Sequence, residues 1–288
     1  MRFAFFPGCK ITHFAPQYEA ATRAVLSELG VEFAEIEFGC CGYPVRHQHF
    51  NSFLISAARN LALAEKQGLG IFTPCQCCFG SLKKADYLLA QDENLRSEVN
   101  QALAKEGLAV LGAVEVKHLL TVLRDDVGLE TLKEKAVRPF KDLKVAAHYG
   151  CHALRPSKVV GFDDPINPTI LENLVAATGA KAVDWPERLD CCGNPLSGKN
   201  DDLALDLTRK KLAGAKLAGA DCLCVACTYC HLQFDEVQFS MLDRLGEDGG
   251  LPAILYPQLL GLSMGLSPES LGLEANRLDL TKVMDFLA

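Results

Sequence analysis

Ten of the thirteen cysteines in this 288-residue chain form one pattern that occurs twice. Each copy has a single cysteine, then an adjacent cysteine pair followed by glycine, then two cysteines separated by two residues. The first copy contains Cys9, Cys40, Cys41, Cys75 and Cys78, and the second contains Cys151, Cys191, Cys192, Cys227 and Cys230. Five thiols per copy indicate a metal centre that uses more thiolate ligands than the four of a structural zinc ion.

The composition is typical of a globular protein, with 49% hydrophobic and 23% charged residues. A net charge of −7 provides no basic surface for nucleic acid or for an anionic membrane. No apolar run approaches the roughly 18 residues of a membrane-spanning helix. The apolar start ends at Pro7-Gly8, which predicts a first strand and not a signal peptide. So many cysteines without an export signal predict a cytoplasmic protein whose thiols bind metal or do redox work.

The two cysteine sets indicate an internal duplication. Matched cysteines are 142 residues apart at the single cysteine, 151 at the adjacent pair and 152 at the spaced pair. The increase from 142 to 151 implies an insertion of nine residues in the second half, which we place between residues 156 and 168. A charged stretch at residues 133–144 is the expected boundary, and it gives an N-terminal domain of residues 1–143 and a C-terminal domain of residues 144–288.

Strands and helices are expected to alternate in each half. Strands are predicted at residues 3–6, 32–38, 69–73, 145–147, 181–185 and 222–226. Helices are predicted at residues 17–29, 50–67, 168–179 and 203–217. This order predicts an α/β fold with two units and mostly parallel sheets. Each cysteine group follows a predicted strand, so each half should gather its five thiols at the carboxyl edge of its sheet.

The adjacent pairs favour iron over zinc. Neighbouring side chains in a strand or turn point apart, so Cys40 and Cys41 would chelate one small ion awkwardly but can bind different irons of a cluster. Zinc remains an alternative. A redox dithiol of the thioredoxin kind is a second alternative for Cys75 and Cys78, although the repeat ties this pair to three more cysteines.

The doubled pattern resembles the cysteine-rich CCG domain proteins, above all the B subunit of heterodisulfide reductase and its bacterial relatives. The resemblance covers nearly the whole chain. It includes the stretches Phe6-Pro7-Gly8-Cys9, His148-Tyr149-Gly150-Cys151-His152 and Cys227-Thr228-Tyr229-Cys230-His231-Leu232. It implies two pseudo-repeated Rossmann-like CCG domains and two noncubane [4Fe–4S] clusters, each bound by all five cysteines of one half. The first-half gaps of 30 and 33 residues are slightly short for the pattern, which leaves zinc open in one half.

The resemblance also implies an activity and partners. The chain would be an oxidoreductase component that reduces or forms a small-molecule disulfide between its two clusters. Electrons would arrive through an iron–sulfur protein like the C subunit of that enzyme from a flavin protein like its A subunit. One rival is a non-catalytic CCG electron-transfer component of a succinate or fumarate reductase or of a quinone-linked dehydrogenase. A second rival is a scaffold stabilised by zinc.

Three histidines next to ligand cysteines are candidates for work beside a cluster. His148, His152 and His231 can hydrogen-bond a cluster or supply a proton to a leaving thiolate, or they can be structural. Gly42 and Gly193 are expected to allow a tight turn beside the ligands.

The other polar residues and spare cysteines are expected to be less specific. Arg46, His47 and His49 are interpreted as a solvated loop and alternatively as a substrate entrance. The run Arg209-Lys210-Lys211 is predicted to be a solvated helix face. The cysteines outside the pattern are expected to be a spare thiol and two buried small hydrophobes: Cys77, and Cys222 with Cys224.

Overall fold

A computed structural model describes residues 2–246 and 249–288 and contains two four-stranded sheets. The first sheet has the order β2-β1-β3-β4 and the second has the order β6-β5-β7-β8, and all pairs of neighbouring strands are parallel. The strands are β1 (Arg2–Phe5), β2 (Glu32–Glu35), β3 (Ile71–Thr73), β4 (Val116–His118), β5 (Lys144–His148), β6 (Lys181–Val183), β7 (Cys222–Val225) and β8 (Ala253–Leu255). The predicted fold of two repeated Rossmann-like units is confirmed.

Helices connect the strands in both halves. The first half has α1 (Cys9–Phe14), α2 (Pro16–Glu28), α3 (Phe50–Lys66), α4 (Gln76–Gln91), α5 (Glu93–Leu103), α6 (Leu119–Thr121) and α7 (Leu129–Lys135). The second half has α8 (Ser157–Val160), α9 (Ile170–Ala177), α10 (Asp201–Leu217), α11 (Thr228–Leu232), α12 (Gln238–Leu245), α13 (Tyr256–Ser263) and α14 (Thr281–Met284). Each α/β crossover returns the chain to a parallel neighbour, as parallel pairing requires.

The predicted strands and helices lie where the sequence placed them, with ends shifted by a few residues. Helix α2 begins at Pro16, which suits a first helical turn, and buries Tyr18, Ala21 and Val25 at helical spacing. In the sheet core, Phe5 stacks on Phe72 of the neighbouring strand, with 4.9 Å between the ring centroids. Burial of such a face stabilises each sheet by removing apolar surface from water.

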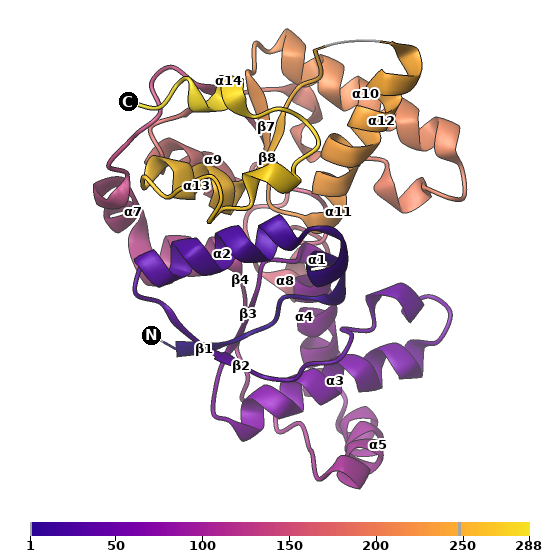
Figure 1. Ribbon diagram of the computed structural model, residues 1–288. Coiled ribbons are helices and arrows are strands. Elements are labelled where there is room, and N and C mark those ends of the chain that lie inside the picture. The colour runs from indigo at the N-terminus through magenta and orange to yellow at the C-terminus, as the bar shows by residue number, and fades with distance from the viewer. Residues whose placement is uncertain (1, 247–248) are drawn as a thin grey trace.

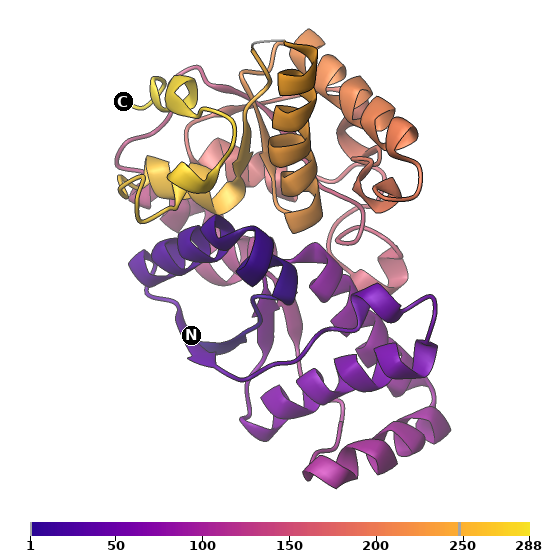
Figure 2. The ribbon, with the colours of Figure 1, turned by 45° about the vertical axis from the view of Figure 1, so that its right-hand side comes forward.

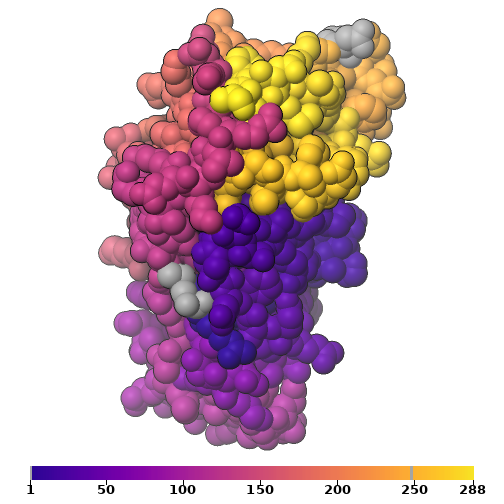
Figure 3. Space-filling view, turned by 60° about the vertical axis from the view of Figure 1, so that its left-hand side comes forward, coloured from indigo at the N-terminus to yellow at the C-terminus, as the bar shows by residue number. Residues whose placement is uncertain are grey.

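The two halves lie one above the other and pack through helices (Figure 1, Figure 2). Helix α2 of the first half packs against α13 of the second half, and α4 packs against α8. Helix α7 packs against α9 in the same way. In the space-filling view, the yellow C-terminal residues lie directly on the indigo N-terminal residues (Figure 3). The halves therefore share a continuous contact and form one body.

The insertion predicted for the second half lies between β5 and α9. It contains α8 and the loop that follows it, whereas the first half passes from α1 to α2 through Ala15 alone. The inserted helix α8 is the segment that packs on α4, so the extra residues help to join the halves. The boundary between residues 143 and 144 stays a prediction.

No helix among the described residues is both long enough and apolar enough to cross a membrane.

Candidate metal centres

The first-half cysteines come together where the strands of the first sheet end. Cys9 begins α1, the adjacent pair follows β2, and the spaced pair lies at the start of α4, for which Cys75 is the N-cap residue. Their thiols interact: Cys41 hydrogen-bonds with Cys40 and Cys78. Cys75 also hydrogen-bonds with Cys78, and Cys9 is close enough to Cys40 to influence its ionisation.

The second-half cysteines repeat this arrangement at the carboxyl ends of β5, β6 and β7. Cys192 hydrogen-bonds with Cys191 and Cys230, and Cys227 hydrogen-bonds with Cys230. Cys151 is close enough to Cys192 and Cys227 for their charge to act on it. Five thiols therefore lie together at the edge of each sheet.

The adjacent cysteines differ in exposure, yet their sulfurs lie together. Cys40 and Cys191 are exposed, whereas Cys41 and Cys192 are buried. The sulfurs within each pair remain in contact, because a tight turn brings the two side chains together.

The same thiols are favoured as thiolates in both halves. A hydrogen bond from Cys40 lowers the pKa of Cys41 well below its ordinary value, and one from Cys191 does the same for Cys192. Hydrogen bonds lower the pKa of Cys75 and of Cys227 in the spaced pairs, from Cys77 and Cys230 respectively. Metal binding requires deprotonated thiols, so each site prepares two of its five sulfurs as ligands.

Gly42 and Gly193 allow the turn beside each adjacent pair. Gly42 has φ +78° and Gly193 has φ +97°, in the left-handed region that favours glycine. A Cβ atom at Gly42 would lie 2.7 Å from the Phe53 carbonyl oxygen, and one at Gly193 would clash with the Ala204 carbonyl oxygen. Each glycine N–H points at the sulfur two residues earlier, at 3.4 Å, so the turn also supplies a donor to a ligand cysteine.

Cys77 lies between the two thiol sets. Its thiol hydrogen-bonds with Cys227 of the second half and with Cys75 of the first, and these bonds raise the pKa of Cys77. Thr228 of the second half lies close enough to Cys75 to influence its ionisation across the junction. The two sets of ligands therefore face each other through the loops that carry the spaced pairs.

The three candidate histidines have different surroundings. His148 Nε2 lies 3.2 Å from Cys230 Sγ, and His152 Nδ1 lies 3.4 Å from Cys151 Sγ and 3.8 Å from Cys77 Sγ. Burial lowers the pKa of His148 to about 3, and burial also lowers the pKa of His152, so both rings are neutral at pH 7.

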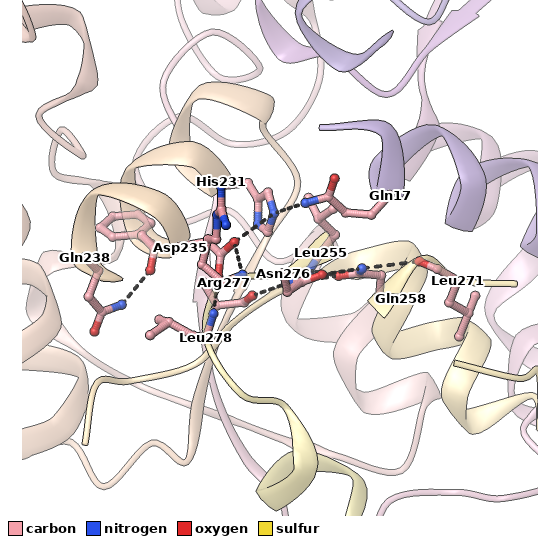
Figure 4. A network of polar contacts seen from close by, with 12 residues as sticks. Gln17, His231, Asp235, Gln238, Leu255, Gln258, Leu271, Asn276, Arg277 and Leu278 are labelled. Carbon is pink, nitrogen blue, oxygen red and sulfur yellow. Dashed lines mark hydrogen bonds and ion pairs between the residues drawn. The ribbon is translucent and has the colours of Figure 1, made fainter. Parts of the chain in front are cut away.

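His231 points away from the sulfurs and into the junction between the halves. Its Nε2 lies 3.0 Å from Gln17 Nε2 of α2, and 3.9 Å from an oxygen of Asp235 (Figure 4). Asp235 accepts hydrogen bonds from the backbone N–H groups of Arg277 and Leu278. This network holds α2, α11 and the C-terminal segment together.

A cavity of about 710 Å³ opens between the halves beside the second thiol set. Four second-half ligand cysteines line it together with Cys77 and His152. It is also lined by the cations Lys10, Arg46 and Lys199, and its lining among the described residues includes no Asp or Glu. Arg46 and His47 line this cavity, which favours the alternative interpretation as a substrate entrance. His49 is exposed and is the N-cap residue of α3.

Lys211 is the polar residue whose surroundings differ most from the prediction. Its side chain is buried, with 1% exposure, and not part of a solvated helix face. Its Nζ donates to the Glu187 carbonyl oxygen and lies 4.6 Å from the centre of the Trp185 ring. The neighbouring Lys210 is exposed as predicted, and it pairs with Asp190. The repeat contains a signal for this burial that the prediction did not use. Lys211 and the buried Asn60 are as far apart in the sequence as the two adjacent cysteine pairs, so they occupy matched positions.

The remaining two cysteines are distant from this chemistry. Cys222 and Cys224 alternate on β7, are fully buried, and have pKa values raised by that burial. They are packed as small apolar side chains.

The donor chemistry of each site fits an iron–sulfur cluster. Each offers five free thiols at one sheet edge, and thiolates are the ordinary ligands of such clusters. Among residues 2–246 and 249–288, no group of three or more His, Cys, Asp or Glu side chains is arranged around the position of a single metal ion.

Comparisons with known proteins agree with the duplicated architecture. The model of the CCG cysteine-rich domain matches residues 3–83 and 145–235. The chain is 37% identical to the B subunit of the ferredoxin/F(420)H(2)-dependent CoB-CoM heterodisulfide reductase of Methanosarcina acetivorans, over 100% of this chain and 96% of that protein. It is 36% identical to the 8-methylmenaquinol:fumarate reductase membrane anchor subunit of Wolinella succinogenes, over 98% of both chains.

A solved structure has the same fold. The crystal structure of a hypothetical protein from Helicobacter pylori matches with a TM-score of 0.73 and 19% identity, over 96% of this chain. This chain spans about half of that one, 51% of its length. The two matched domain copies and the full-length likeness to the Methanosarcina protein show that the chain belongs to the cysteine-rich CCG domain family.

Proposed function

We propose that the chain is the catalytic iron–sulfur component of a heterodisulfide reductase-like complex, equivalent to the B subunit of that enzyme. It would reduce, or in the reverse direction form, a small-molecule disulfide between two noncubane [4Fe–4S] clusters. The observation that carries this proposal is the juxtaposition of the two thiol sets, with Cys77 in contact with both Cys75 and Cys227 beside a cavity. The relatives named as heterodisulfide reductase components support an iron–sulfur role in an oxidoreductase complex.

The ligands would be the ten cysteines of the doubled pattern, five for each cluster. When bound, such clusters supply one-electron transfer, and two of them together match the two electrons that disulfide cleavage consumes. The protein's part is to hold the clusters on facing sheet edges and to favour the thiolate form of Cys41 and Cys75 in one site and of Cys192 and Cys227 in the other. Zinc in one half is the alternative that iron and zinc analysis decides.

The cavity indicates how the chain would treat its substrate. Its volume of about 710 Å³ is within the range of small-molecule sites. Lys10, Arg46 and Lys199 give its lining a positive charge, which favours an anionic disulfide or thiol. His152, with Nδ1 beside Cys151 and Cys77, is placed to carry a proton for a departing thiolate.

The partners proposed for this chain are an iron–sulfur protein like the C subunit of heterodisulfide reductase and a flavin protein like its A subunit. All thirteen cysteines are free thiols, which supports a reducing compartment such as the cytoplasm.

Separate Cys41→Ser and Cys192→Ser variants test this function. Each removes a buried ligand of one site, so each should lose about half of the iron and abolish disulfide turnover in the complex. Cys222→Ser is the matched control, because that buried thiol is not part of the cavity lining. Full disulfide turnover in either ligand variant would contradict the proposal.

The rival function is a non-catalytic electron-transfer role. The likeness to the fumarate reductase component of Wolinella succinogenes favours it. Purification with native partners separates the two functions. A flavin protein together with a ferredoxin-like iron–sulfur protein supports the reductase, whereas a succinate dehydrogenase-type flavoprotein supports the rival.

A further inference from the structure

The two metal centres have unequal electrostatic surroundings, although the duplication makes their cysteine ligands equivalent. Helices α3 and α10 both have 17 residues and occupy matched places after the adjacent cysteine pairs. At the same position along these helices, the first half has Asn60 and the second half has Lys211. Both side chains are buried, at 0% and 1% exposure, so a neutral amide in one half corresponds to a buried ammonium in the other.

Asn60 binds the backbone of the first cysteine pair. Its Nδ2 donates to the Cys40 carbonyl oxygen at 3.1 Å, and its Oδ1 accepts from the Gly39 N–H at 2.9 Å. In the second half, Thr208 takes over the contact with the pair and donates to the Cys192 carbonyl oxygen at 3.0 Å. Lys211 follows Thr208 by three residues, so both side chains lie on the same face of α10.

The charge of Lys211 acts on the ligand cysteines. Burial lowers the pKa of Lys211 to about 8, which leaves it mainly protonated at pH 7. After burial, Cys230 has the largest effect on the pKa of Lys211, ahead of Asp190, Cys192 and Glu187, so Lys211 lies near two ligand cysteines. Among the described residues it forms no ion pair with a carboxylate, since Asp190 pairs with Lys210. Its hydrogen bond goes to a neutral carbonyl, that of Glu187, so the positive charge is not cancelled by direct pairing.

A second difference between the halves also stabilises negative charge at the second-half centre. His148 Nε2 lies 3.2 Å from Cys230 Sγ, and this nitrogen, when it carries a proton, donates a hydrogen bond to that sulfur. The matched residue of the first half is Phe6, which is buried and packs on Phe38 with 4.9 Å between the ring centroids. Hydrogen bonds to the sulfurs and local net charge are two of the factors that set cluster potentials.

We propose that the buried ammonium of Lys211, helped by the ring N–H of His148, gives the iron–sulfur centre of the second half a higher reduction potential than that of the first. This inference rests on the proposed pair of clusters. Reduction adds negative charge, and a positive charge in a low-dielectric site stabilises the reduced form most strongly. The second-half centre is then the one that accepts an electron first.

Solvent exposure would raise the reduction potential of the first-half centre instead, but the exposure of the ligand cysteines differs little between the halves. Cys9 is exposed, whereas its counterpart Cys151 is half-buried. The other four ligand positions have the same exposure class in both halves. Because Coulomb energies are several times larger in a buried site than at an exposed one, the ammonium of Lys211 outweighs one more exposed thiol.

A redox titration of the iron-loaded protein followed by EPR tests the inference. The wild type should show two midpoint reduction potentials. Lys211→Asn places the residue of the first half in the second half and should lower only the higher midpoint potential. The expected shift is at least tenfold in the redox equilibrium, about 59 mV for one electron. Lys211→Arg should keep the wild-type value because it keeps the charge. Lys210→Asn, the exposed neighbour, should change neither midpoint.

Iron and sulfide analysis separates this inference from the proposed function. A protein that folds with native partners but carries no iron contradicts the clusters and therefore the function. An iron-loaded wild type with equal midpoints overturns the inference alone, as does a Lys211→Asn variant that retains both wild-type midpoints. Lys211→Met preserves the apolar stem without the charge and provides a second neutral variant if the amide disturbs folding.

Discussion

Among single residues, two cysteines next to each other have different roles. Cys78 interacts with Cys41 and Cys75 within the first set, whereas Cys77 points to Cys227 across the junction. The sequence pattern predicts a ligand role for Cys78 alone. The tertiary structure adds that Cys77 reaches the other half, a contact that no spacing within one repeat can reveal.

Paired variants distinguish these roles. Cys78→Ser should lose about half of the bound iron, because it removes one of five ligands of a single site. Cys77→Ser should keep the full iron content, because both ligand sets remain intact. Iron and sulfide analysis of anaerobically purified protein measures this. Equal iron loss in the two variants would show that Cys77 is itself a ligand.

A pair of glycines gives a second prediction about individual residues. Gly42→Ala should lower the free energy of unfolding by about 3 kcal/mol, from left-handed strain and from a Cβ atom too close to Phe53. Gly198→Ala is the matched control. It has φ +75° with nothing within 4 Å, so it should lose only about 1 kcal/mol. Urea unfolding measures both, and equal losses would contradict a role for the close contact.

Among helices and strands, one buried carboxyl joins separate segments. Asp235 lies between α11 and α12 and accepts backbone hydrogen bonds from Arg277 at 2.9 Å and Leu278 at 3.0 Å. Burial raises the pKa of Asp235 to about 6, and the nearby charged or titratable groups are Glu236, Arg277 and His231. The network in Figure 4 thus fixes the C-terminal segment through a carboxyl group with a raised pKa.

The pH dependence of stability follows from this pKa. Since the folded-state pKa is raised above its ordinary 3.8, the protonated form stabilises the fold below about pH 4, and this contribution is lost as the pH rises through about 6. Relative to Asp235→Asn, wild type should lose roughly 1 kcal/mol between pH 5 and 8. Urea unfolding at both pH values checks this, and parallel profiles for the two proteins would contradict it.

In the molecule as a whole, the halves are bound by more than one kind of contact. Helices α2 and α13 pack together, and buried polar groups cross the junction, including Gln17 with His231 and the Gln76 amide, which donates to the Tyr149 carbonyl oxygen. Separating the halves would leave these groups unpaired or exposed, at a cost in free energy for each.

The chain should therefore unfold in one cooperative transition. Calorimetry of the full chain should give a single peak whose calorimetric and van't Hoff enthalpies agree. Gln17→Ala, which removes one crossing contact, should lower the midpoint without splitting the peak. Two separate transitions in the wild type would mean that the halves are independent units.

Local order along the chain was enough to predict the repeat, the α/β class and the ten candidate ligands. Strands alternate with helices, and a cysteine follows each strand end, so these properties can be read without any knowledge of packing. Parallel topology then brings the strand ends, and hence each set of thiols, to one edge. For the same reason the ends of α3 and α10 were predicted to within one or two residues.

Packing between segments far apart in the chain sets how the halves face each other and what surrounds each site. The buried position of Lys211, the bridge through Cys77 and the place of Lys10 and Lys199 in the cavity all depend on it, and none was predicted. A lysine beside two other basic residues has the pattern of a solvated surface, and the fold alone shows that Lys211 is buried with its Nζ over the Trp185 ring. The ligands occupy matched strand ends in both halves, whereas the residues that pack around them differ, with Lys211 in the place of Asn60.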